Sequence, residues 1–567
     1  MKQKFTRWFY ILTHENGWLR SIAETTADLN NFSIVTSATG MLKNKDMDNV
    51  QSPEEVYQKI AKGGLLFIIG SFSALLIQFI FGIVMIRFLS TEDFGLISLS
   101  LTIIQVLAMI SVLGMDTAVP RYIGKTQGSA PPSGKHRDTT FTVITLVLAS
   151  SVILSIFLSA SAPFVASLFR KPALSWILSV FALMLTPLAL IQIFTALFRG
   201  WGDAKAKTIF QDMMQHLIRL LLLMIAVYLH YDLQGVVWIY VAAVWCTFLL
   251  YLVYTYRKLI GKIGFGFCAD TAKKMIRFAL PLLGAGIVTN LTTWVGTLTL
   301  GFITSSETVG IFNAPLRLTN IIPIPLMALI FIYLPEATRM VAGHHTERLK
   351  QLYVSTTKWA FFLTLPFILF FIIDAEFIVQ RLFGEKYYAS INILQVMSIG
   401  LSFHTFLGPN GMTLVAFGHS RSIFISAAIA SIISILFCYW LIPPYGAIGA
   451  TFSVVIGKVT SNIFLSMVLY QNYRIHPFAG HYIKPLLPVS LIALCMIAFV
   501  RLFAGDHLMV HCMVFLVSGG LVLLSPFITG ALTHHDVAIL SSLEKRITGQ
   551  NRLSDRLAAK APAADYS

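Results

Sequence analysis

Long apolar segments separated by short polar loops repeat along most of the chain. Fourteen of them approach the ~20 residues that a helix needs to cross a bilayer. Since a helix satisfies its backbone hydrogen bonds internally, this pattern predicts an all-α, polytopic membrane protein with about 14 transmembrane helices. The approximate limits are 64–88, 95–117, 140–165, 173–197, 209–230, 235–256, 276–301, 309–334, 353–373, 391–416, 422–443, 447–470, 484–503 and 508–530.

The composition supports this prediction. Of the 567 residues, 56% are hydrophobic and 12% are charged, with a mean hydropathy of +0.75, whereas soluble domains carry about 25% charged residues. Basic cytoplasmic loops that face anionic lipid account for the net charge of +16, so no nucleic-acid partner is expected. The five cysteines form no CxxC pair, and we expect neither a metal site nor a cofactor.

Lysine and arginine gather in alternate loops, for example at 121–137, 199–207 and 257–274. Because this bias sets orientation, we expect an inner (cytoplasmic) membrane protein with both termini in the cytoplasm. Residues 1–62 lack the apolar core and cleavage site of a signal peptide and are predicted to be a cytoplasmic extension. Residues 533–567 are predicted to be a cytoplasmic tail.

The chain is similar to itself at an offset near 215 residues. Ser90-Thr91-Glu92-Asp93-Phe94-Gly95 corresponds to Ser305-Ser306-Glu307-Thr308-Val309-Gly310, six segments later. An even separation gives both copies the same orientation. We therefore predict two parallel six-helix bundles, 63–260 and 261–475, followed by two further helices within 476–532. Parallel repeats of this kind are a transporter architecture, although a duplication retained only for packing is the alternative.

The fifth segment carries three ionisable residues at helical spacing. Asp212, His216 and Arg219 stand at i, i+4 and i+7, which predicts that they share one helical face. An arginine near mid-membrane costs about 2.5–3.5 kcal/mol on insertion scales, so such a residue is by default a functional candidate. Arg219 could bind a phosphate group bidentately, with Asp212 and His216 positioning it. The alternative is a buried Asp212–Arg219 ion pair.

Two further cations stand in apolar segments. Arg317 lies between Asn313 and Asn320 in the eighth segment, which Pro315, Pro323 and Pro325 are expected to bend. This polar, bent helix suits a cavity wall, although Arg317 could instead snorkel to the membrane surface. Lys458 lies near the middle of the twelfth segment and is a candidate substrate or coupling cation, or a neutral buried lysine.

The other candidates carry weaker signals. Asn290, Trp294, His404 and Asn410 could line a cavity and bind sugar, although His404 could equally be a packed, hydrogen-bonded residue. Arg87, Asp116 and Arg121 stand at segment ends, where they could act in gating or serve topology and capping.

Several short motifs carry a family resemblance. They are Ile86-Arg87-Phe88-Leu89 with the following Ser90–Gly95, Gly114–Tyr122, Phe198-Arg199-Gly200 through Gln211, and Tyr445–Ala450. In their order and spacing, over about 63–475, they resemble polysaccharide and oligosaccharide flippases. That family belongs to the superfamily that also contains multidrug and toxin extruders and lipid II flippases.

The resemblance implies a fold of two six-helix bundles around a central cavity. It also implies that the chain moves a polyprenyl-pyrophosphate-linked oligosaccharide from the cytoplasmic to the outer leaflet by alternating access, for cell-surface polysaccharide synthesis. It implies a lipid-linked oligosaccharide substrate, membrane lipids as surroundings, and polysaccharide polymerases and glycosyltransferases as candidate partners. The coupling ion, H⁺ or Na⁺, stays open.

Two other functions remain as alternatives. A cation-coupled multidrug exporter of the same fold would need carboxylates in its cavity, whereas the mid-membrane charges here are positive. A membrane glycosyltransferase or polysaccharide polymerase would need acid–base or metal-binding carboxylates at an aqueous face. The predicted outer loops offer only scattered acids, Asp374, Glu376 and Glu385, so we do not expect an enzyme.

Overall fold

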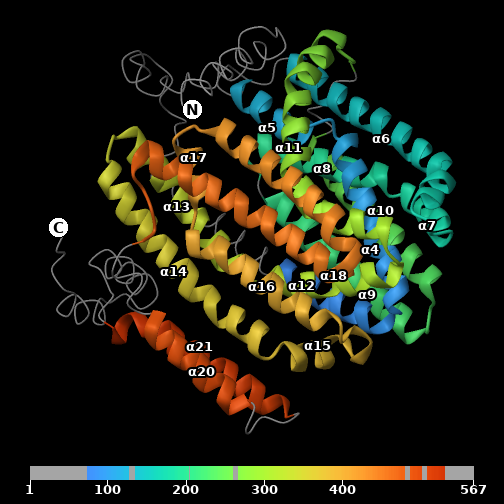
Figure 1. Cartoon of the computed structure of the whole chain (residues 1–567). Coiled ribbons are helices and arrows are strands. Elements are labelled where there is room, and N and C mark those ends of the chain that lie inside the picture. The colour runs from blue at the N-terminus through green and yellow to red at the C-terminus, as the bar shows by residue number, and fades with distance from the viewer. Residues whose placement is uncertain are drawn as a thin grey trace. The chain divides into compact units, whose positions relative to one another are not determined.

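The computed structural model describes residues 73–126, 134–203, 205–259, 266–478, 486–500 and 507–529. Every secondary-structure element in these ranges is a helix (Figure 1). The predicted extension 1–62 and tail 533–567 lie outside the described residues. The all-α fold of a polytopic membrane protein is thereby confirmed.

The first half of the chain contributes one helix from Ser73 to Phe88 and eight further elements. These are α4 (Thr91–Ser111), α5 (Met115–Thr126), α6 (Gly134–Leu168), α7 (Ala173–Ala182), α8 (Leu185–Gly200), the π-helix η3 (Lys207–Met214), α9 (Gln215–Tyr228) and α10 (Leu233–Leu259).

The second half begins at α11 and ends with α18. Its elements are α11 (Ala269–Ile303), α12 (Ser306–Thr319), α13 (Ile324–Ala342), α14 (Thr346–Ile373), α15 (Ala375–Phe383), η5 (Glu385–Tyr387), α16 (Ser390–Leu407), α17 (Asn410–Ala416) and α18 (Ser420–Tyr473). Two more helices, α20 (Leu486–Phe499) and α21 (Leu508–Ile528), follow.

Each of the fourteen predicted segments overlaps a helix, but the boundaries differ. Within the described residues nine helices are long and apolar enough to span a membrane, or ten if α7 and α8, bent by 42°, form one span. The count of fourteen therefore stays a prediction. Segment 309–334 is broken between α12 and α13, where the prolines were expected to bend it, whereas 422–443 and 447–470 run together in α18 around a non-helical Gly446.

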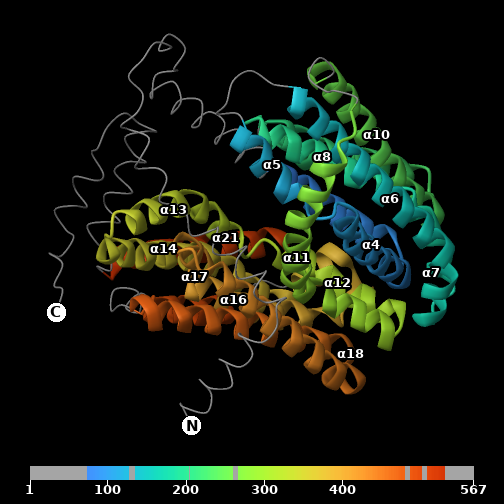
Figure 2. The ribbon, with the colours of Figure 1, turned by 90° about the horizontal axis from the view of Figure 1, so that it is seen from above.

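The two halves meet along α4. This helix packs against α7, α8 and α6 of its own half and against α11 and α12 of the second half. Figure 2 shows α5, α6, α8 and α10 grouped together, with α13, α14, α16 and α17 in a second group and α11 and α12 next to the first. The bundle boundaries at 260 and 475 stay a prediction.

The sequence repeat is also a structural repeat at the helix starts. Ser90 caps α4 by accepting a hydrogen bond from the Asp93 amide (3.0 Å), and Ser305 caps α12 by accepting one from the Thr308 amide (3.3 Å). The two capped helices pack directly against each other. The duplicated motif therefore forms an interface between the halves.

Candidate functional site

A cavity of about 300 Å³ lies among the helices of the first half. Its lining comes from the helix Ser73–Phe88, the α7–α8 junction and α4, α8, α9 and α10, and α12 of the second half contributes Arg317. The polar lining residues are Gln78, Gln105, Gln192, Gln215, His216, Arg219, Tyr240 and Arg317. Among the described residues that line the cavity, none is a carboxylate.

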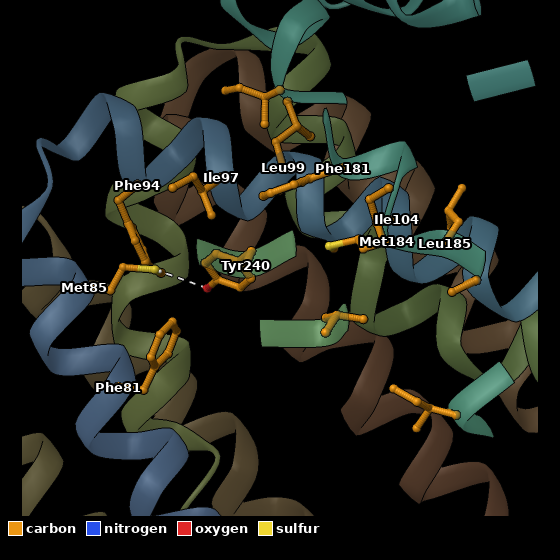
Figure 3. Packing of buried hydrophobic residues seen from close by; sticks show 14 of the residues in the cluster. Phe81, Met85, Phe94, Ile97, Leu99, Ile104, Phe181, Met184, Leu185 and Tyr240 are labelled. Carbon is orange, nitrogen blue, oxygen red and sulfur yellow. Dashed lines mark hydrogen bonds between the residues drawn. The ribbon is translucent and has the colours of Figure 1, made fainter. Parts of the chain in front are cut away.

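Arg219 lies against an aromatic wall. Its guanidinium carbon is 4.8 Å from the ring centroid of Tyr240 and 5.6 Å from that of Phe81. Such cation–π contacts stabilise by about 0.5–2 kcal/mol. The Tyr240 hydroxyl donates to Met85 Sδ (3.2 Å), which fixes the ring, as Figure 3 shows. Arg219 Nε has no hydrogen-bond partner within the described structure.

Arg317 reaches the same cavity from the second half. Its aliphatic stem passes Gly82, where an added Cβ would lie 3.6 Å from Arg317 Cγ, an ordinary contact distance. Arg317 stands in the last turn of α12, where the unpaired carbonyls of a helix end favour a cation. The structure thus brings Arg219 and Arg317 together across the two halves, with Arg317 lining the cavity rather than snorkelling outward.

Two of the three residues expected to share a face, His216 and Arg219, line the cavity. Asp212 does not line it and pairs instead with Lys207, at 3.6 Å. These two partners are five positions apart in the π-helix Lys207–Met214, in which i and i+5 are neighbours. Asp212 and Arg219 form no ion pair, so the alternative of a buried pair between them is wrong.

Lys458 does not join the two arginines at the cavity. It lies on α18 in a buried polar group, where Asn462 Nδ2 donates to the Lys458 carbonyl (2.8 Å). His404 Nδ1 lies 2.9 Å from Asn462 Oδ1, and Asn410 Nδ2 donates to the Asn462 carbonyl (3.1 Å). His404 is therefore hydrogen-bonded between α16 and α18, and the grouping of Lys458 with Arg219 and Arg317 is not what the structure shows.

The remaining asparagines bond to helix backbone or lie at a helix end. Asn313 accepts from Thr297 (3.0 Å) and donates to the Val309 carbonyl, which joins α11 to α12. Asn290 donates to the Gly286 carbonyl of its own helix, and Asn320 is the exposed C-cap of α12. Trp294 donates from Nε1 to Oε1 of the cavity residue Gln105 (3.3 Å) and so links α11 to the lining.

The three residues at segment ends make contacts between helices. Arg87 Nε donates to the Leu382 carbonyl (3.0 Å), and the guanidinium of Arg121 lies 5.1 Å from the Phe278 ring centroid. Both contacts join the first half to the second. The Asp116 carbonyl accepts from Arg199 Nη2 (2.5 Å) within the first half. Roles for these residues in gating or topology stay predictions.

Sequence reasoning missed the glutamines. Gln78, Gln105, Gln192 and Gln215 stand one each in the first, second, fourth and fifth apolar segments, and all four line the cavity. A lone amide in each of the first, second and fourth segments, and a pair, Gln211 and Gln215, in the fifth, were an available signal, because an amide in hydrocarbon is unfavourable unless it faces protein or water. Within the described ranges no group of three histidine, cysteine or acidic residues could hold a metal ion.

Comparisons with known proteins agree with the fold. Residues 60–341 match the family model described as "Polysaccharide biosynthesis protein". The structure resembles the lipid II flippase MurJ in its inward closed conformation, with a TM-score of 0.65 and 15% identity over 86% of this chain and 100% of that one. It also resembles an inward-facing multidrug resistance MATE family transporter of the MOP superfamily, with a TM-score of 0.58 and 17% identity over 71% of this chain and 94% of that one.

A search of curated protein sequences finds no significant match. These two neighbours in structure are a lipid II flippase and a multidrug resistance transporter and not enzymes, and at 15% and 17% identity the likeness shows the fold. The resemblance indicated by the sequence motifs is thus confirmed: over residues 60–341 the chain carries the matched region of the polysaccharide biosynthesis protein family, on the fold shared by a lipid II flippase and MATE transporters.

Proposed function

We propose that this protein moves a polyprenyl-pyrophosphate-linked oligosaccharide from the cytoplasmic to the outer leaflet by alternating access, for cell-surface polysaccharide synthesis. One observation carries the proposal: Arg219 and Arg317, from different halves, line one cavity in which no described lining residue is acidic. The expected location is the inner membrane, and polysaccharide polymerases and glycosyltransferases are the proposed partners.

The two arginines suit a pyrophosphate. Taking a multiply charged anion out of water into hydrocarbon is prohibitive unless fixed cations and hydrogen-bond donors replace its hydration. Each guanidinium offers a planar fork of donors that matches phosphate oxygens. The four lining glutamines add neutral donors and acceptors that suit the sugar hydroxyls next to the pyrophosphate.

The volume of the cavity limits how much of the substrate it can enclose. About 300 Å³ is at the lower end of small-molecule sites, which span roughly 300–1,000 Å³. The cavity therefore accommodates a charged headgroup, while the prenyl tail stays in the bilayer. The rest of the glycan requires a wider, open state of the cycle.

The same lining disfavours the exporter of cationic drugs. A cationic ligand beside Arg219 and Arg317 would meet like charge, and no described lining carboxylate would offset its loss of hydration. Because Arg317 comes from the second half, a bound anion bridges the halves. Movement of one half against the other then changes the anion's contacts, which a transport cycle requires.

The test is translocation in reconstituted vesicles. The probe is a short-chain polyprenyl-pyrophosphate that carries one fluorescent sugar, and leaflet exposure is measured with a membrane-impermeant quencher. We expect Arg219→Ala and Arg317→Ala each to lower the initial rate at least ~10-fold, since each removes a charge-assisted contact with the headgroup. Arg348→Ala, at an exposed position on α14, is the matched control and should translocate at the wild-type rate.

A second probe separates headgroup recognition from lipid recognition. A polyprenol joined to the same sugar without pyrophosphate should be moved poorly by wild-type protein and should be insensitive to Arg219→Ala. Wild-type rates for both cavity variants, with normal insertion, would disprove the cationic-cavity mechanism.

A further inference from the structure

Lys171 of the first half caps a helix of the second half. It stands in the turn between α6 and α7 and is 8% exposed. Its Nζ donates to the carbonyls of Gly301 (2.7 Å) and Thr304 (2.6 Å), at the end of α11. These carbonyls belong to the last turn of a helix, where backbone acceptors lack intrahelical donors and a cation is favoured.

Lys386 makes the reciprocal contact. It lies in η5 of the second half, and its Nζ donates to the carbonyls of Arg87 (3.1 Å) and Leu89, at the end of the helix Ser73–Phe88. Lys386 is 215 positions after Lys171, and Thr304 is 215 positions after Leu89, which is the offset of the sequence repeat. Each half therefore sends the equivalent lysine to cap the first described helix of the other half.

Both ammonium groups are partly removed from water. Burial lowers the pKa of Lys171 from its ordinary value, with Glu92 opposing the shift. The pKa of Lys386 is lowered by partial burial and by the nearby Arg87. Lys171 is buried among its carbonyl acceptors, whereas Lys386 is an exposed residue whose ammonium group loses part of its hydration where it meets the Arg87 and Leu89 carbonyls.

The residues around the two lysine contacts differ. Beside Lys386, Arg87 Nε donates to the Leu382 carbonyl (3.0 Å) and Nη2 to the Arg381 carbonyl. The position equivalent to Arg87 in the second copy is Phe302, whose ring packs edge-on against Phe169 at 6.2 Å. One junction thus adds an arginine to its lysine, and the other adds an aromatic contact.

We propose that Lys171 and Lys386 are a matched pair of latches that hold the two halves together at the crossing of α4 and α12. The crossing is formed by Ser90–Gly95 and Ser305–Gly310, and one carbonyl bound by each lysine, that of Leu89 or Thr304, immediately precedes one of these motifs. Releasing a lysine frees the end of the first described helix of one half and, with it, the start of the helix at the crossing. The proposal rests on the proposed function and deepens it, because these latches would set how readily the two halves separate at the crossing of α4 and α12 when the cavity opens.

Hydrogen–deuterium exchange of the unliganded full-length protein in lipid nanodiscs tests the latches directly. Lys171→Met and Lys386→Met remove the donor while keeping an unbranched side chain. We expect either substitution to speed amide exchange about tenfold in peptides covering both 88–97 and 303–312, since loss of a charge-assisted contact lowers the free energy of local opening. The double variant should exchange faster than either single variant.

Arg381→Met is the matched control. Arg381 is exposed near the same junction, and it accepts the hydrogen bond from Arg87 through its backbone carbonyl, which the substitution keeps. Its exchange should match wild type. Thermal unfolding and size-exclusion profiles of all variants show whether the fold is kept. Because Lys386 is exposed, Lys386→Met is not expected to disturb the core.

Two outcomes would overturn the latches. One is unchanged exchange in both peptides in the double variant. The other is faster exchange confined to the helix end next to the removed lysine, which would reduce each lysine to a local cap. Because exchange is measured without substrate, these results are independent of the translocation assay. If Arg219→Ala translocates normally while the latch variants exchange faster, the proposed function fails and the latches stand.

Discussion

Gly95 and Gly310 pack backbone to backbone where α4 crosses α12. A Cβ at Gly95 would lie 1.8 Å from the Ser306 carbonyl oxygen, and one at Gly310 would lie 2.1 Å from the Thr91 carbonyl oxygen. No side chain fits at either position without moving a helix. The glycine shared by both copies of the sequence motif is therefore what allows the two halves to approach.

This contact predicts the effect of Gly95→Ala and Gly310→Ala. Each added methyl group would push backbone apart, at a cost of about 1–3 kcal/mol typical of overpacking. We expect a lower apparent melting temperature for both variants, measured by intrinsic fluorescence in detergent. Gly284→Ala on α11, where an added Cβ meets no atom within 4 Å, is the control and should be neutral or stabilising. Equal melting temperatures for all three variants would contradict the close approach.

The aromatic wall behind Arg219 can be tested through Tyr240. Tyr240→Leu removes the ring 4.8 Å from the guanidinium, and we expect binding of a soluble short-chain prenyl pyrophosphate to weaken about fivefold, equivalent to about 1 kcal/mol. Tyr240→Phe keeps the ring and loses only the hydroxyl bonded to Met85, so its affinity should stay within about twofold of wild type. Equal losses in both variants would show that the hydroxyl, and not the ring, matters. Isothermal titration measures both.

Lys458 is expected to differ from Arg219 in a binding assay. Because it lies with His404 and Asn462 and not at the cavity, Lys458→Gln should leave the affinity for the same soluble pyrophosphate within about twofold, whereas Arg219→Ala should lower it at least ~10-fold. A tenfold loss in Lys458→Gln would place that lysine in the headgroup site after all. The translocation rate of Lys458→Gln, measured separately, then shows whether Lys458 contributes to transport in a way other than headgroup binding.

A buried acidic residue beside α21 predicts a pH effect on stability. Asp374 follows α14, is 2% exposed and lies 3.3 Å from His511 Nδ1, and Phe377 stacks on the His511 ring. Burial raises the pKa of Asp374 above 3.8, while His511 opposes the shift. The native protein therefore binds this proton more tightly than the unfolded chain. Its stabilising contribution is present below pH 3.8 and is lost as pH rises through the raised pKa.

Asp374→Asn removes that titration. We expect the melting temperature of the variant minus that of wild type to increase by ~2 °C or more as pH rises through this window. Glu376→Gln, an exposed neighbour, should show no such trend. A constant difference between Asp374→Asn and wild type would mean that Asp374 does not titrate differently on folding.

Local sequence patterns were enough to predict the helices and to identify the charged residues that are candidates for the site. The length of an apolar run indicates a membrane span directly, because backbone polar groups in hydrocarbon must be satisfied by internal hydrogen bonds, as they are in a helix. Spacing could not show which members of a polar stripe reach the cavity. His216 and Arg219 line it, whereas Asp212, one turn earlier, pairs with Lys207 in the π-helix Lys207–Met214.

The sequence alone determined an all-α membrane protein, an internal repeat at 215 residues, and three cations in apolar segments that require an explanation, because these follow from composition and from short-range periodicity. Only the tertiary structure decided which polar residues meet. It placed Arg317 beside Arg219 and Lys458 elsewhere, and it paired Lys171 and Lys386 with helix ends of the opposite halves. Such contacts join residues 98 or more positions apart, and helix crossing and packing, which no local pattern encodes, bring them together.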